Sequence, residues 1–117
     1  MNTANLQLEG LCMAVAALVE LMKEKGIASQ HDVDVALARV EQSAVEGKKD
    51  DLSLANIGAI TFPIRLLRLA NSTSFEGHPL PFKELARRVG EAKDRHATLS
   101  EEEILKLATI LEHERDA

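Results

Sequence analysis

The stretch from Leu6 to Met22 constrains the fold of this chain more than any other, because nearly all of its residues are apolar. Drawn as a helix, it places its few polar side chains on a narrow stripe and leaves the opposite side apolar. The stripe contains Glu9, Met13, Ala16, Glu20 and Glu24, and the apolar side contains Leu8, Leu11, Ala14, Val15, Leu18, Val19, Leu21 and Met22. Such a helix predicts burial of its broad apolar side. We therefore expect it to be the central helix of the fold, covered by other helices of the chain or of a partner.

Start and stop signals divide the rest of the chain into further helices, and no segment shows the alternation typical of a strand. Gly26 is expected to end the first helix, and Ser29 with Asp32 forms a capping box for the second. Pro63 predicts a sharp kink or a break, because proline lacks the N–H that a helix interior needs. A capping box at Ser100 predicts a last helix over 100–112. The sequence thus predicts an all-α fold, a single domain over 1–117 that forms a compact bundle of five to six helices.

Composition indicates the compartment of the protein and argues against a membrane-spanning segment. The chain has one cysteine, Cys12, and a lone thiol is typical of a reducing compartment. The uncharged run inside the first helix is bracketed by Glu9 and Glu20, and it is shorter than the ~20 residues that span a bilayer. No basic residue precedes it, as a signal peptide would require. We expect a cytoplasmic protein without a membrane segment.

Charge is distributed unevenly along the chain, whose formal net charge is −5. Acidic residues exceed basic ones over 1–47 and 96–117, whereas basic residues exceed acidic ones over 48–95. This pattern favours pairing between the basic middle and the acidic ends, within one chain or between two. A nucleic-acid interface needs a stronger basic face, so the charge argues against that class of partner.

The sequence lacks the motifs of the common catalytic and cofactor sites. No nucleotide-binding glycine loop and no nucleophile elbow is present, and the four histidines do not have metal-ligand spacing. We expect no cofactor and no metal, and the absence of these motifs argues against catalysis without deciding it. The remaining polar candidates for a ligand site are Arg68, Asn71 and His78, at or next to the loop predicted over 71–79.

Two short segments resemble known families. Residues 65–77 (RLLRLANSTSFEG), together with PFKELARRVGE over 81–91, resemble part of the HDOD domains. These are helical bacterial signalling modules, related to metal-dependent phosphohydrolases but generally without their His–Asp metal ligands, so the resemblance implies a non-catalytic scaffold. Residues 1–47 do not follow the family pattern. Residues 23–37 (KEKGIASQHDVDVAL) resemble the N-terminal helical arm of nitrile hydratase subunits, whose clustered-cysteine metal motif is absent here, so no function is carried over.

These observations lead to two functional hypotheses of different classes. The first is a non-catalytic helical interaction or scaffold module that self-associates, as a homodimer burying more than about 1,200 Å² in total. On this hypothesis Leu18→Asp, in the middle of the apolar side, would destroy folding or assembly. The alternative is a small-molecule or anion-binding protein that uses the 71–79 loop, or an HDOD-like signalling fragment. The partner and the ligand stay open.

Overall fold

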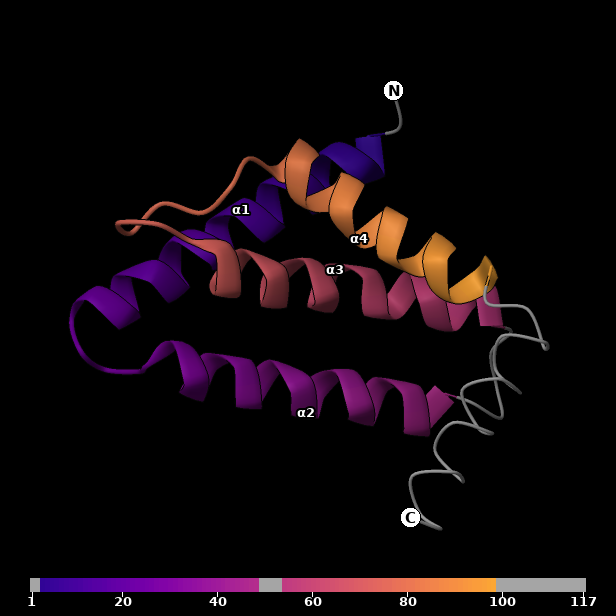
Figure 1. The fold of residues 1–117 in the computed structure, drawn as a ribbon, viewed down its shortest axis with the longest axis horizontal. Helices are drawn as coiled ribbons and strands as arrows, with labels where there is room; N and C mark the ends of the chain where they lie inside the picture. Colours follow the sequence, from indigo (N-terminus) through magenta and orange to yellow (C-terminus); the bar gives the residue numbers. More distant parts are fainter. Residues whose placement is uncertain (1–2, 49–53, 99–117) are drawn as a thin grey trace, which may run out of the picture.

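The computed structural model describes residues 3–48 and 54–98, and these residues form four α-helices (Figure 1). They are α1 (Thr3–Glu24), α2 (Gln30–Lys48), α3 (Leu54–Thr73) and α4 (Phe82–Thr98). Within these ranges β-structure is limited to one isolated bridge between Phe75 and His78. The all-α prediction is confirmed. The helix predicted over 100–112 lies outside the described residues, so four helices stand where five to six were expected.

The helix around which the others are arranged is α3, because it packs against α1, α2 and α4. Figure 1 shows α2 running along one side of α3, with α1 and α4 on the other side. The core lies between α1, α3 and α4, where Leu66 and Leu85 have no exposed surface. Its other buried members are Cys12, Ala16, Ala70 and Val89. The prediction that α1 is the central helix is therefore wrong.

Helix α1 turns most of its broad apolar side outward, contrary to the prediction; of that side, Leu8, Val15 and Val19 are half-buried, and Leu8 packs against the core. Its buried residues are Cys12, Ala16 and Glu20, and two of them belong to the stripe that was expected to face water. Leu18, expected at the centre of the buried side, is 61% exposed. The small side chains of Cys12 and Ala16 allow α1 to approach the core closely, and Lys23 neutralises Glu20 at 2.8 Å. Close packing of these small side chains, with the Glu20 charge paired, thus outweighs burial of the larger apolar side.

Helix α3 continues through Pro63, so of the two predicted alternatives, a sharp kink or a break, the break is wrong. Proline at this position removes the bond that its N–H would make to the carbonyl of Ala59. Ala59 is an exposed residue, so water can replace the missing donor. The buried Thr61 hydroxyl donates to the carbonyl of Ile57 at 2.9 Å, within its own helix. A continuous α3 is long enough to contact all three of the other helices.

The signals predicted at the α1–α2 connection are confirmed. Gly26 has a φ of 73°, and the N–H of Ile27 donates to the carbonyl of Met22 at 3.0 Å, which is the Schellman ending of a helix. The Ser29 N–H donates to Asp32 Oδ2 at 3.1 Å, and the Asp32 N–H donates to Ser29 Oγ at 3.0 Å. The N–H of Ser29, and then its hydroxyl, hold the pKa of Asp32 below its ordinary value. These local bonds determine where α1 ends and α2 begins.

We predict that Leu66→Ala destabilises the protein by about 2–5 kcal/mol, because it leaves a cavity at the fully buried centre of α3. The matched control is Val40→Ala on α2, whose side chain is exposed and should cost well under 1 kcal/mol. Urea unfolding followed by circular dichroism measures both values. Equal losses for the two variants would contradict the position of the core.

Candidate functional site

The outward side of α1 forms a continuous strip of apolar side chains, which we call the α1 apolar face. Its members are Leu6, Leu11, Ala14, Ala17, Leu18, Leu21 and Met22, and all of them are exposed. Leu11 is 63% exposed, and the one charged residue between residues 10 and 22, Glu20, is buried on the opposite side of the helix. The strip extends about 24 Å along the helix axis. Single exposed leucines are common on proteins, but a continuous uncharged strip is typical of an interaction surface.

A buried polar cluster at the end of α1, the Lys23 cluster, determines which side of this helix faces inward. Lys23 Nζ donates to Glu20 Oε1 at 2.8 Å, to Asn71 Oδ1 at 2.9 Å and to Ser74 Oγ at 3.0 Å. Asn71 Nδ2 donates to the carbonyl of Gln30 at 2.9 Å. The cluster therefore joins α1, the start of α2 and the end of α3. Rotating α1 to bury its apolar face would separate the Lys23 ammonium from Asn71 and Ser74 and expose the Glu20–Lys23 pair to water.

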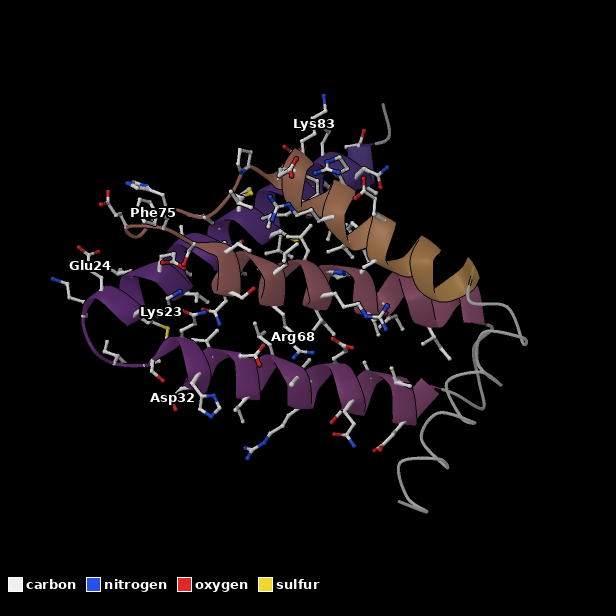
Figure 2. All side chains as sticks on the ribbon, viewed as in Figure 1. Lys23, Glu24, Asp32, Arg68, Phe75 and Lys83 are labelled. Atoms are coloured by element: carbon white, nitrogen blue, oxygen red, sulfur yellow. The ribbon has the colours of Figure 1, made fainter. Side chains whose placement is uncertain are left out.

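The three ligand candidates from the sequence do not meet at one place. Asn71 is buried and its side chain is used within the Lys23 cluster. Arg68 binds Asp34 of α2, and Figure 2 shows it directed between α3 and α2, away from the turn that carries Phe75. His78 is exposed at that turn. Two of the three candidates thus make internal contacts, and the predicted 71–79 loop is shorter because α3 extends to Thr73.

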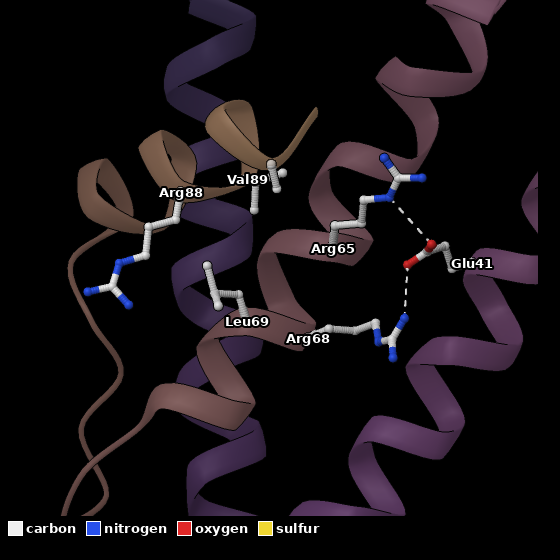
Figure 3. A pocket seen from close by; sticks show the side chains of 7 residues that line it. Glu41, Arg65, Arg68, Leu69, Arg88 and Val89 are labelled. Carbon is white, nitrogen blue, oxygen red and sulfur yellow. Dashed lines mark hydrogen bonds and ion pairs between the residues drawn. The ribbon is translucent and has the colours of Figure 1, made fainter. Parts of the chain in front are cut away.

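Arginines of α3 bind carboxylates of α2. Arg68 contacts both oxygens of Asp34, with Nε–Oδ1 at 3.0 Å and Nη2–Oδ2 at 3.4 Å. Glu41 lies between two arginines, accepting from Arg65 Nε and from Arg68 Nη1, each at 3.3 Å (Figure 3). The hydrogen bond from Arg68 is the main reason that the pKa of Asp34 is below its ordinary value. These pairs align α2 along α3.

A groove of about 400 Å³ lies beside these ion pairs. Arg65, Arg68 and Arg88 line it together with the apolar side chains of Leu69 and Val89. Figure 3 shows Arg65 and Arg68 turned toward Glu41, with Arg88 pointing away from them. Arg88 is paired with a carboxylate of its own helix at 2.8 Å. All three guanidinium groups are therefore neutralised within the chain, which leaves little attraction for an anion.

A second hollow, of about 500 Å³, lies beside the Lys23 cluster and includes His78. The turn that forms one wall has positive φ angles at Glu76 (52°) and Gly77 (81°), and the backbones of Phe75 and His78 exchange two hydrogen bonds of 3.0 Å.

Within residues 3–48 and 54–98, no three His, Cys, Asp or Glu side chains are grouped so that they could hold a metal. Burial raises the pKa of the Cys12 thiol, which disfavours the reactive thiolate.

By length and composition α1 is also able to cross a membrane, a criterion that core helices of soluble proteins and signal sequences meet as well. In the described structure one side of α1 is already occupied, because Cys12 and Ala16 belong to the core shared with α3 and α4. Glu20 lies on that same side in the Lys23 cluster. Exposing this side to lipid would place an acidic side chain in the hydrocarbon.

Comparisons of the chain with models of known protein families, with curated proteins and with solved structures found no match. The resemblance of residues 65–77 to HDOD domains therefore rests on those residues alone.

We predict that Lys23→Met destabilises the protein by about 3–5 kcal/mol, because it leaves the buried carboxylate of Glu20 without its partner. Lys83→Met, at an exposed position of α4, is the matched control and should have little effect. The double variant Glu20→Gln, Lys23→Met should lose less stability than Lys23→Met alone. Thermal or urea unfolding measures these differences, and an unchanged stability of Lys23→Met would contradict the role of the cluster.

We also predict an unusually acidic carboxyl group on α4. Hydrogen bonds from Arg87 and then Arg88 lower the pKa of Glu84 from 4.5 to about 2. Because the folded-state pKa is the lower one, this pairing stabilises the fold above about pH 4.5 and is lost as the pH falls toward 2. Carbon-detected NMR of the Glu84 carboxyl should show the low midpoint, and Arg87→Ala should raise it. A midpoint near 4.5 in the unmodified protein would refute the pairing.

Proposed function

We propose that this protein is a non-catalytic helical interaction module that self-associates as a homodimer through the α1 apolar face. The observation that carries the proposal is the exposure of Leu11 and Leu18, at 63% and 61%, in the middle of an uncharged strip. Removing such a strip from water is favourable roughly in proportion to its apolar area. A second copy of the chain supplies a matching strip, and a two-fold axis is the commonest symmetry by which identical surfaces meet.

The size of the strip sets the expected strength of the dimer. Two helices in contact over about 24 Å, with side chains from both flanks, bury an area at the lower end of the range for stable interfaces, about 1,200 Å² in total. Interfaces of this size support dissociation constants in the micromolar range when few polar contacts add to them. We therefore expect an equilibrium between monomer and dimer.

A second copy explains the surface of α1 better than a lipid bilayer does. Helices that lie on membranes carry lysine and arginine beside their apolar side, where these residues contact anionic lipids. Helix α1 instead contains Glu9, Glu20 and Glu24. Its basic residue Lys23 is used internally, and the single exposed lysine that follows it, Lys25, stands next to Glu24. The charge of α1 therefore disfavours an anionic membrane surface.

The alternative of a small-molecule or anion-binding protein receives less support. Arg68 is paired with Asp34 and Glu41, Asn71 is buried with its side chain bound inside the Lys23 cluster, and of the three candidates only His78 lines the hollow beside that cluster. The HDOD-like segment 65–77 is compatible with the proposal, since it too implies a scaffold without catalysis. A cytoplasmic location remains part of the proposal, and the lone, buried thiol of Cys12 is consistent with it.

We predict that sedimentation equilibrium finds a dimer at micromolar concentrations and that Leu18→Asp prevents its formation. Because Leu18 is exposed in the single chain, the variant should keep its helical circular dichroism and its monomer stability. The expected increase in the dissociation constant is at least about 100-fold, because a charge is buried without a partner. Val40→Asp, at an exposed apolar position of α2, is the matched control and should leave the dimer intact.

Two results would overturn the proposal. The first is a monomer of the unmodified protein at all concentrations up to about 100 μM, a range in which weak specific dimers are detected. The second is binding to phosphatidylcholine and phosphatidylserine vesicles in a co-sedimentation assay that Leu18→Asp abolishes, since lipid would then be the occupant of the α1 apolar face.

A further inference from the structure

Six exposed residues of α1 follow one another at alternating spacings of four and three. They are Gln7, Leu11, Ala14, Leu18, Leu21 and Lys25, which we call the α1 seam. Lys25 directly follows the helix, and its N–H donates to the carbonyl of Leu21 at 3.0 Å, so it continues the helical path. This spacing is that of the contact line in a two-stranded coiled coil. The seam has apolar residues at its centre and one polar residue at each end.

The inference rests on the proposed self-association and specifies its geometry. We propose that two α1 helices pair in antiparallel orientation about a two-fold axis, with Ala14 facing the partner's Leu18. Continuing outward, Leu11 then faces the partner's Leu21, and Gln7 faces the partner's Lys25. In this register each seam residue has a counterpart of its own polarity.

Side-chain sizes match across the helix pair in this register. The central layer combines one small residue, Ala14, with one large residue, Leu18, on each side of the axis. Alternating small and large side chains across facing positions fills space without voids. A parallel pair in the same register would put alanine opposite alanine and leave a gap between the leucine layers on either side.

The charge at the end of the seam also favours the antiparallel pair. A parallel pair would bring the ammonium groups of the two Lys25 residues together, which is repulsive. In the antiparallel pair, Lys25 instead meets the amide of the partner's Gln7, whose oxygen accepts a hydrogen bond from the ammonium. The two helix dipoles also oppose each other in that arrangement. An antiparallel pair shifted by one heptad would place Gln7 against leucine or Lys25 against alanine, where the polar group lacks a partner.

A glycine beside the seam supports a close approach of the second helix. Gly10 lies in the interior of α1, where glycine costs about 1 kcal/mol relative to alanine. No atom of the described chain lies within 4 Å of the position that a side chain there would occupy, so packing within the chain does not require glycine. Ala17 flanks the seam on the same side and is also small and exposed.

Two cysteine variants test the register without removing an apolar residue from the seam. In a Cys12→Ala background, Gln7→Cys and Lys25→Cys are prepared separately, one of them with a mass tag, and are mixed in a glutathione redox buffer. The proposed geometry predicts that the disulfide between the two variants exceeds either homodisulfide by at least about tenfold. Predominant homodisulfides would show a parallel pair and overturn the inference.

Substitutions of one charge provide a second measurement that needs no disulfide. Gln7→Glu places a carboxylate opposite the partner's Lys25 and should tighten the dimer about twofold to fivefold, whereas Gln7→Lys should weaken it by a similar factor. The opposite order would overturn the register. A dimer by sedimentation that shows neither the mixed disulfide nor this order refutes the geometry while leaving the proposed self-association in place. A monomer at all concentrations refutes both.

Discussion

The ammonium of Lys23 makes the contacts on which the arrangement of this protein depends. It lies 2.8 Å from Glu20 Oε1 and 2.9 Å from Asn71 Oδ1, and it thereby holds the end of α1 against the end of α3. Asn71 extends the connection to the backbone of Gln30 at the start of α2. A buried charge is tolerated only when it is paired and hydrogen-bonded, so these contacts allow very little rotation of α1. The end of α1, the start of α2 and the end of α3 therefore form one joint.

The outward direction of the α1 apolar face follows from that joint. With Glu20 and Lys23 inside, Cys12 and Ala16 point to the core, and Leu11 and Leu18 necessarily point to the opposite side of the helix. Helix α3 packs against the inner side of α1. The other sides of α3 are covered by α2 and α4. The described part of the chain consequently leaves a long apolar strip in water, which is the physical basis of the proposed self-association.

The ion pairs between α2 and α3 occupy the side chains that a ligand site near Arg68 would need. In the sequence, Arg68 is a candidate for ligand binding because it lies near Asn71 and a predicted loop. In the structure, its guanidinium is bound by Asp34 and Glu41, which come from α2. Within one helix, side chains that contact each other are three or four positions apart. The partners of Arg68 are more than twenty residues away, so these pairs depend on how the two helices align. The sequence could suggest arginine as a ligand-binding group, but it could not show that another helix already occupies it.

The sequence by itself determined the all-α class and the local boundaries at Gly26, Ser29 and Asp32, because these depend on backbone conformation and on hydrogen bonds between near neighbours. It did not determine which side of α1 is buried. Hydrophobic periodicity separates the more polar side of a helix from the more apolar side, but it does not fix which of them packs against the core. That choice was made by the tertiary structure, through the close packing of Ala16 and the hydrogen bonds that Lys23 donates to Asn71 and Ser74 at the end of α3. The continuity of α3 through Pro63 was decided in the same way, since packing against three helices holds a helix that proline alone would interrupt.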